Sequence, residues 1–314
     1  MNRRHFLATS SFAIIAAALK ELPASAYGGQ QPSPATTKFL DLRRNVGIFT
    51  GQGGTIGWLA TADGVLVVDS QSPATAQVCL DGLRQKSPHP IDVLINTHHH
   101  GDHTGGNKTF RPAVKTIVAH ANAALWLKKT AEAAKTEANQ AYPDKTFTTT
   151  WKTTIGDENV SAKHYGPAHT SGDVIVVFEK ANIVHMGDLM FHCMYPFIDR
   201  PAGASIANWI KTLGKVSDEH SADTLYVFGH ARSGLEVTGY NTDLARFGDF
   251  LNAAVEHTRT QMKAGKSKDE IAKTPALKGF EDYPSGSGFL SLSGVLSTAY
   301  DELSAKQGAG NELG

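Results

Sequence analysis

The sequence of 314 residues predicts an α/β domain with helices on both sides of sheet, because strand-like and helical patterns alternate in both halves of the chain. Its hydrophobic content of 41% and charged content of 19% are typical of a globular protein, which excludes extensive disorder and fibrous repeats. No long linker and no fixed-period repeat divides the chain, so we expect one main domain over residues 39–306.

Residues 1–26, MNRRHFLATSSFAIIAAALKELPASA, predict an export signal peptide. Arg3 and Arg4 precede a short apolar stretch, and Ala24-Ser25-Ala26 is a small-x-small cleavage pattern. The stretch is shorter than the ~20 apolar residues that span a bilayer, so we expect no membrane anchor after cleavage. Because Arg-Arg-x-Phe-Leu resembles a twin-arginine signal, we expect a periplasmic or secreted protein that is exported already folded.

Two strand-like runs, 55–60 and 65–68, flank the turn residues 62–64 and predict a hairpin. Residues 27–38 are rich in Pro, Gly, Ser and Thr, and we expect a disordered lead-in there. The first half then continues with strands over 91–95 and 114–119 and with helices over 74–85 and 121–141.

The second half begins again with a strand pair, 173–178 and 183–185, and has a further apolar strand over 225–228. Residues 279–287 are rich in turn formers and predict a loop, and 307–314 predict a flexible tail. The helices expected in this half run over 206–216, 241–264, 267–272 and 289–303.

The charge of the chain argues against a nucleic-acid partner. The sequence has 30 basic and 30 acidic residues, and loss of residues 1–26 leaves it slightly acidic, whereas a nucleic-acid binder needs a basic face. Cys79 and Cys193 are too few for a disulfide framework or a Cys-rich zinc module, and the sequence leaves open whether they are bridged. It also leaves the oligomeric state open, and we expect a small-molecule substrate.

The most informative segment is His98-His99-His100-Gly101-Asp102-His103, directly after the apolar strand that ends at Ile95. Five potential metal ligands in six residues are far more than structural histidines explain, because burying them without partners costs several kcal/mol. His98 and His100, two residues apart, can point the same way from an extended segment. Asp102 and His103, beyond the turn at Gly101, can then face a second position nearby.

Three further candidate ligands, His169, Asp188 and His230, each lie where a strand meets a loop. Ligands at strand ends can share one rim of a sheet, which is where α/β folds usually place their active sites. We therefore expect these three side chains to join the histidine-rich segment at one edge of the domain.

In order and spacing, these residues resemble the metal-binding pattern of the metallo-β-lactamase superfamily. The resemblance implies an αββα sandwich with a two-metal centre at one edge. By position, it assigns His98, His100 and His169 to one metal and Asp102, His103 and His230 to the other. Asp188 would bridge the two metals.

Imidazole and carboxylate ligands suit Zn²⁺, two per chain, and also iron or manganese. Two such metals lower the pKa of a water between them towards ~7, so that hydroxide can attack a carbonyl or phosphoryl centre. Asp102 is expected to orient this nucleophile and to carry its proton, which makes it the catalytic residue. Asp69 follows the apolar run 65–68 and matches an acidic position of the family, as a partner for a ligand imidazole.

Asp188 favours an exported dinuclear hydrolase that acts on an ester, thioester, lactone or amide-like carbonyl, because an Asp bridge is typical of such members. True β-lactamases usually have Cys or Ser at this position, but export keeps a class B β-lactamase open as an alternative. A mononuclear-iron sulfur (persulfide) dioxygenase, which binds one metal with a subset of these ligands, is a second alternative.

Substrate contacts are the least specific part of the prediction. Aromatic and histidine side chains that follow Asp188 can line the mouth of the site, and these are His192, Tyr195, Phe197 and Trp209. The remaining histidines His99, His164 and His185 are expected to be structural or solvent-facing.

Overall fold

The computed structural model describes residues 36–284, 286–288 and 290–311. The predicted export signal, and the lead-in as far as residue 35, lie outside these residues. Within the described part of the chain, no helix has the length and apolar character needed to cross a membrane.

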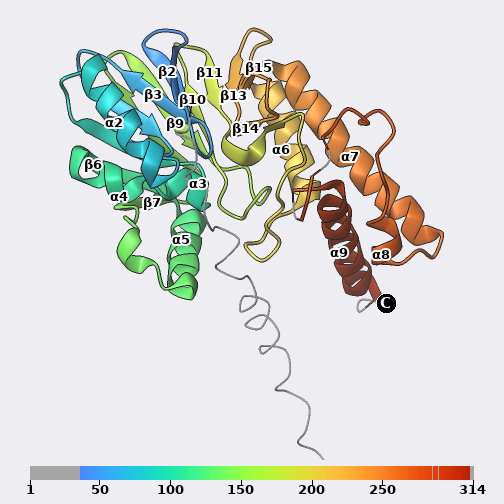
Figure 1. Cartoon of the computed structure of the whole chain (residues 1–314). Coiled ribbons are helices and arrows are strands. Elements are labelled where there is room, and N and C mark those ends of the chain that lie inside the picture. The colour runs from blue at the N-terminus through green and yellow to red at the C-terminus, as the bar shows by residue number, and fades with distance from the viewer. Residues whose placement is uncertain (1–35, 285, 289, 312–314) are drawn as a thin grey trace, which may run out of the picture. The chain divides into compact units, whose positions relative to one another are not determined.

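Two β-sheets face each other at the centre of the domain (Figure 1). The strands of the first sheet are, in spatial order, β1 (Lys38–Asp41), β2 (Val46–Thr50), β3 (Ile56–Ala60), β4 (Val65–Val68), β5 (Ile91–Asn96), β6 (Val114–His120) and β7 (Lys145–Phe147). Those of the second sheet are β15 (Thr238–Gly239), β13 (Leu225–Val227), β11 (Ile183–His185), β10 (Ile175–Phe178), β9 (Glu158–Lys163) and β8 (Thr150–Ile155). A small third sheet pairs β12 (Phe191–His192) with β14 (His230–Ala231).

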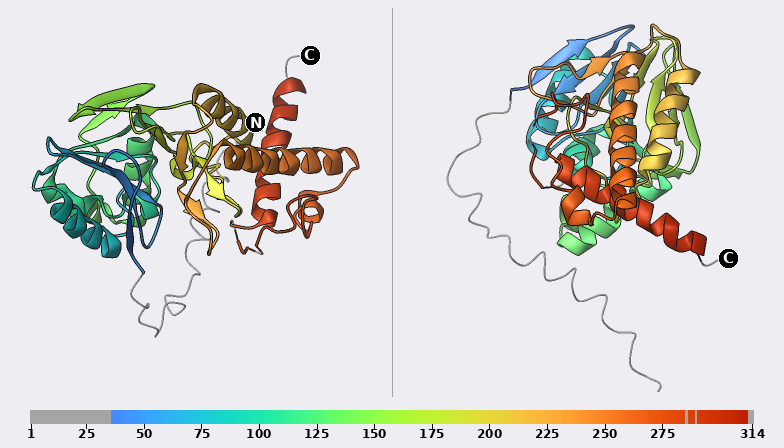
Figure 2. Two further views of the ribbon diagram at one scale, coloured as in Figure 1. Left: turned by 90° about the horizontal axis from the view of Figure 1, so that it is seen from above. Right: turned by 90° about the vertical axis from the view of Figure 1, so that its right-hand side faces the viewer.

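Helices cover the outer faces of both large sheets, which confirms the αββα sandwich (Figure 2). The helices from the first half of the chain are α2 (Pro73–Lys86), α3 (Gly101–Thr104), α4 (Asn107–Phe110) and α5 (Ala121–Ala134). The helices from the second half are α6 (Ile206–Glu219), α7 (Asn241–Lys263), α8 (Lys268–Ile271) and α9 (Leu292–Asn311).

Strand β4 shows why a run of apolar residues forms a central strand. Successive side chains of a strand point to opposite faces, so Leu66 and Val68 enter the core between the sheets. Val65 and Val67 pack on the other face, in the core that α2 shares with this sheet. All four side chains are buried, so every position of the strand is apolar.

The predicted hairpin of β3 and β4 and the strand pair of β10 and β11 are both confirmed as antiparallel pairs. Strand β4 then runs parallel to β5, and β11 runs parallel to β13. Parallel neighbours end at the same edge of a sheet, so the loops after these strands meet at one rim.

Several element boundaries differ from the prediction. The helix expected over 121–141 ends at Ala134, because Lys135 adopts the left-handed conformation (φ 57°) and Thr136 N donates back to Ala131 O. The last helix begins at Leu292 and continues to Asn311, so the predicted tail is helical as far as that residue. Lys38, expected in the lead-in, belongs to β1. Strands β1, β2, β7, β8, β9, β12, β14 and β15 are absent from the prediction.

The two cysteines are not bridged. Cys79 is fully buried on α2, and burial raises the pKa of its thiol far above the usual value. Cys193 is a free thiol in the loop after β12 and is half-buried.

Candidate metal centre

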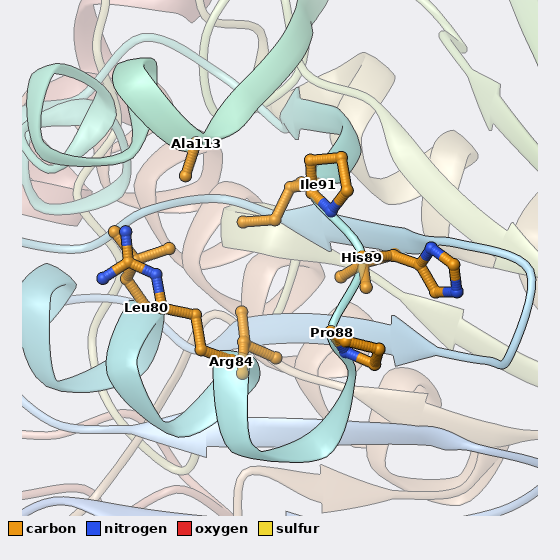
Figure 3. A pocket seen from close by; sticks show the side chains of 9 residues that line it. Leu80, Arg84, Pro88, His89, Ile91 and Ala113 are labelled. Carbon is orange, nitrogen blue, oxygen red and sulfur yellow. The ribbon is translucent and has the colours of Figure 1, made fainter.

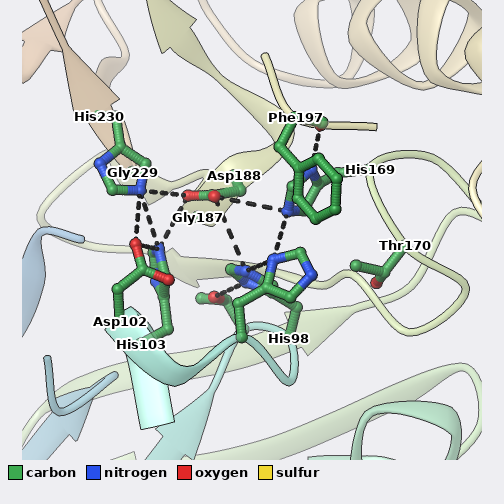
Figure 4. A network of polar contacts seen from close by, with 12 residues as sticks. His98, Asp102, His103, His169, Thr170, Gly187, Asp188, Phe197, Gly229 and His230 are labelled. Carbon is green, nitrogen blue, oxygen red and sulfur yellow. Dashed lines mark hydrogen bonds and ion pairs between the residues drawn. The ribbon is translucent and has the colours of Figure 1, made fainter. Parts of the chain in front are cut away.

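The loops at one rim of the sandwich bring the seven predicted ligands together (Figure 4). The segment from His98 to His103 follows β5 and turns into α3, and His169 lies in the loop before β10. Asp188 lies in a short 3₁₀ turn, η4 (Gly187–Leu189), after β11, and His230 begins β14 after β13. Residues from both halves of the chain therefore form one cluster.

The first half of the cluster consists of three imidazoles and one carboxylate. His100 Nδ1 lies 3.1 Å from His98 Nε2 and 2.9 Å from His169 Nε2. Asp188 Oδ2 lies 3.7 Å from His98 Nε2 and 3.4 Å from His169 Nε2. We call these four residues the first ligand group.

The second ligand group consists of Asp102, His103 and His230, again with Asp188. His230 Nε2 lies 3.3 Å from His103 Nε2 and 3.1 Å from Asp102 Oδ2. The other oxygen of Asp188, Oδ1, lies 2.9 Å from His103 Nε2 and 3.4 Å from His230 Nε2. The two oxygens of one carboxylate thus face two different ligand groups.

In four of the site imidazoles, the ring nitrogen that points away from the ligand groups (the outward nitrogen) lies beside an oxygen atom. These pairs are His98 Nδ1 with Thr97 Oγ1 (3.0 Å), His100 Nε2 with Asp199 Oδ2 (3.0 Å), His103 Nδ1 with Asp69 Oδ2 (2.8 Å) and His169 Nδ1 with Phe197 O (2.8 Å). A carbonyl or carboxylate oxygen only accepts, and the Thr97 hydroxyl already donates to Asp69. The outward nitrogens of these four rings therefore carry protons, and in a neutral imidazole the inward nitrogen then carries a lone pair.

This arrangement fits a metal in both ligand groups. In the first ligand group, inward lone pairs that face one another at 2.9–3.1 Å repel, and a cation between them removes the repulsion. Asp188 Oδ1 is buried and has no well-aligned hydrogen-bond donor among the described residues, as expected of an oxygen that binds a metal. Neutral imidazoles and carboxylates are the donors that zinc, iron and manganese accept.

The protonation of the first ligand group suits metal binding. Burial lowers the pKa of His98 well below its usual value, and the neighbouring His103 lowers it further. The pKa of His169 is lowered to about 3, mainly by burial and further by the neighbouring His100. Burial alone would raise the pKa of Asp188, but His103 and His230 hold it well below its usual value. Neutral imidazoles around an ionised carboxylate are the states in which these groups bind metals.

In the second ligand group, carboxylates act against the effect of burial. Burial would lower the pKa of His230, but Asp188 and Asp102 raise it to about 9. Burial would likewise lower the pKa of His103, but Asp188 and Asp102 raise it well above 6.5. His103 and His230 together overcome the effect of burial on Asp102 and lower its pKa to about 2. Protons therefore compete with a metal more strongly in this group than in the first.

Two glycines make room for the ligands. A Cβ atom at position 54 would lie 2.0 Å from the ring of His103, and one at position 229 would lie 2.1 Å from Asp188 Oδ1. No real Cβ makes such contacts, so the chain needs Gly54 and Gly229 for these side chains to reach the centre.

Asp69, predicted to contact a ligand imidazole, is fully buried and accepts hydrogen bonds from Thr97 N and Oγ1 and from His103. Its backbone adopts the left-handed conformation (φ 63°), which is uncommon outside glycine. A strained residue that binds its surroundings at three points is typical of a functional site. The Thr97 hydroxyl, which donates to Asp69, also lies 3.0 Å from His98 Nδ1, so Asp69 helps to position His98 as well.

Asp199 is a functional candidate that the sequence analysis missed. Its Oδ2 lies 3.0 Å from His100 Nε2 and 3.4 Å from His99 Nε2, and its Oδ1 accepts from Ala202 N. The same short segment supplies Phe197 O to His169 Nδ1, so residues 197–199 support two imidazoles of the first ligand group. His99 itself is buried beside Asp199 and does not face solvent.

We expect Asp199→Asn to weaken metal binding by about 10–100-fold, because the amide no longer holds the His100 proton as a carboxylate does. Chelator competition with zinc-loaded protein measures the affinity. Asp81→Asn, a matched change on the exposed surface of α2, should leave it unchanged. Equal affinities of the Asp199 variant and the unchanged protein would contradict this role.

A cavity of about 330 Å³ opens onto the ligand groups. Its lining residues are His100, Asp102, Asp188, Phe191, Met194, Phe197, His230 and Leu290. Of the four side chains predicted to contact substrate, only Phe197 lines this cavity.

The other three predicted contacts lie elsewhere. Trp209 is fully buried in the core, where its Nε1 donates to Leu189 O. Tyr195 is also buried and packs against Phe250 and Tyr283. The ring of His192 contacts Phe228, and its Nδ1 lies 2.8 Å from Glu236 O. Proximity in sequence to Asp188 therefore does not bring these side chains to the cavity.

A second cavity, of about 280 Å³, lies between α2 and the start of β5 (Figure 3). Leu80, Arg84, His89 and Ile91 are among its lining residues, and none of the seven predicted ligands is. It is therefore separate from the candidate metal centre.

Comparison with known proteins gives one family. A model described as "Metallo-beta-lactamase superfamily" matches residues 50–235, which include all seven predicted ligands. Metallo-beta-lactamase IND-1 of Chryseobacterium indologenes is 26% identical over 200 residues, which are 63% of this chain and 80% of that protein.

Two solved structures show the same fold at low identity. A metallo-beta-lactamase from Pontibacter korlensis superposes with a TM-score of 0.59 and 18% identity, over 69% of this chain and 99% of that one. The stereoselective inverting sec-alkylsulfatase Pisa1 from Pseudomonas sp. gives a TM-score of 0.66 and 15% identity, over 84% of this chain and 50% of that one.

Proposed function

This chain belongs to the metallo-beta-lactamase superfamily, and from that premise we propose that it is a hydrolase with two zinc ions that cleaves an ester, thioester, lactone or amide-like carbonyl compound. One observation carries the proposal. The two oxygens of Asp188 face separate ligand groups, so one carboxylate can join two metals.

The two ligand groups would hold one metal each. His98, His100 and His169 supply inward nitrogens to the first, and Asp102, His103 and His230 supply ligand atoms to the second. When bound, two divalent metals would supply Lewis acidity towards a carbonyl oxygen and a hydroxide nucleophile at neutral pH. Iron or manganese would fit the same donors.

Asp102 has the exposure and protonation state for a role in proton transfer. It lines the cavity, and its side chain is 45% exposed, unlike the buried Asp188. Its lowered pKa, to about 2, keeps it ionised at neutral pH, so it can accept a proton and orient an attacking water. His230 Nε2, 3.1 Å away, holds its Oδ2 in place.

We further propose that the protein acts outside the cytoplasm. The twin-arginine-like signal at residues 1–26 supports this location, because that route exports folded proteins from the cytoplasm.

A class B β-lactamase is the second candidate, favoured by the metallo-β-lactamases among the relatives. Asp188 argues against it, because an Asp bridge is typical of hydrolases acting on other carbonyl compounds.

Metal analysis combined with a substrate panel tests the proposal. Protein purified without added metal should contain two equivalents of zinc and hydrolyse a lactone, ester or thioester faster than nitrocefin. Asp102→Ala should lower turnover by about 10²–10³-fold while the fold is retained, and Asp81→Asn should not.

Each contrary result has a distinct meaning. One iron per chain with oxygen uptake on a persulfide would indicate a dioxygenase. Turnover of nitrocefin alone would indicate a β-lactamase, and protein that binds no metal would refute the metal centre.

A further inference from the structure

We infer that the substrate carries an uncharged, apolar group next to the bond that is cleaved. The inference rests on the proposed function, because it places the reacting bond at the two ligand groups. It is carried by the wall of the cavity beside them: the lining residues outside the ligand groups are Phe191, Met194, Phe197 and Leu290, and no lysine or arginine is among the described lining residues.

The apolar wall extends from one ligand group to the other. Phe191 stacks on His230 of the second group, with ring centroids 5.4 Å apart and an angle of 20° between the planes. The ring of Phe197 packs against the ring of His100 in the first group, with ring centroids 5.3 Å apart. Met194 lies between them in sequence and lines the same cavity. A substrate bound across both groups therefore contacts apolar side chains along its length.

The arginines closest in sequence to this wall are engaged elsewhere. Arg232 Nη1 donates to Asp282 O, and Arg246 Nη2 pairs with Asp282 Oδ1 at 2.9 Å. Arg200 donates to Ala204 O and lies 3.7 Å from Glu302. None of these three arginines lines the cavity, so none is placed to pair with a substrate carboxylate there.

The cavity offers a substrate carboxylate no lysine or arginine partner among its described lining residues. Apart from the imidazoles, its titratable lining side chains are Asp102 and Asp188, and both belong to the ligand groups. Burying a charge without a partner costs far more than burying an apolar group, so the remote part of a good substrate is neutral.

The volume of the cavity limits the size of the apolar group that the substrate can carry. A volume of about 150 Å³ holds benzene, so the 330 Å³ here is enough for about two ring-sized groups. Penicillins and cephalosporins carry a carboxylate beside the lactam ring, so the cavity disfavours them even though the fold is shared.

A matched pair of esters tests the inference by turnover. 4-Ethylphenyl butyrate and 4-(carboxymethyl)phenyl butyrate have similar size and leaving groups but differ by one negative charge. We expect kcat/KM on zinc-loaded protein to favour the neutral ester by about tenfold or more. Equal values for the two esters would overturn the inference while leaving the proposed hydrolase intact.

A matched pair of thiols tests it without turnover. Benzyl mercaptan and 4-(mercaptomethyl)benzoic acid both attach to zinc through sulfur, so their affinities differ through the ring substituent alone. Calorimetry on zinc-loaded protein should show about tenfold tighter binding of benzyl mercaptan. If this preference holds but no ester is hydrolysed, the apolar site stands and the proposed function fails. Equal affinities would overturn the inference.

A charge introduced into the wall should change the preference. Met194 is half-buried, and Met194→Arg should reduce the neutral-to-anionic ratio in both assays by about tenfold or more. Val78→Arg, at an exposed position on α2, provides the matched control and should leave both ratios unchanged. An unchanged ratio in a folded Met194 variant would contradict the placement of the substrate.

Discussion

Replacing Asp188 with alanine is expected to lower activity by about 10²–10³-fold or more. The bound zinc should fall from two equivalents to one or fewer. The physical reason is that Asp188 alone faces both ligand groups, 2.9 Å from His103 and 3.4 Å from His169. Without it, five imidazoles and Asp102 remain, but nothing joins the two sites.

Zinc content by mass spectrometry and turnover of the preferred substrate measure this effect. Asp81→Ala is the control, because Asp81 is an exposed carboxylate whose partners, Gln77 and Arg84, lie on its own helix. An Asp188 variant that retains two zinc equivalents and full turnover would show that this residue does not join the metals.

Asp69→Asn is expected to cause the largest loss of stability, about 3–5 kcal/mol in the free energy of unfolding. The amide has the size of the carboxylate, but its nitrogen replaces one acceptor. Thr97 N, Thr97 Oγ1 and His103 Nδ1 all donate to Asp69, so at least one buried donor loses its partner in either orientation of the amide.

Urea denaturation of the metal-free protein measures this loss separately from any effect on metal binding. Asp63→Asn, in the exposed turn between β3 and β4, is the control and should change stability little. If the Asp69→Asn variant and the unchanged protein unfold at the same midpoint concentration of urea, these hydrogen bonds do not stabilise the domain.

Much of the fold could be predicted because local patterns specify it. The apolar run of β4 and the helical spacing of α2 both reflect burial on known faces, and both elements are confirmed. Strands β8 and β9 could not be predicted in this way. Their exposed faces carry Thr, Lys and Asn, so they have no continuous apolar run.

The candidate ligands could be proposed because four of the seven lie within the six residues 98–103. Asp199 could not, because it lies 99 residues from His100 in the chain and meets it only after folding. Trp209 shows the opposite case. Sequence position alone cannot show that its ring lies in the core, 5.6 Å from His169, and not in the cavity.

The segment from Phe197 to Asp199 has a consequence for how this protein can evolve. The ring of Phe197 forms part of the substrate wall, while its carbonyl oxygen and the carboxylate of Asp199 support His169 and His100. A new substrate range acquired by changing this loop therefore also alters metal retention. Met194 supports no ligand in the described structure, so adaptation to new substrates is less constrained there.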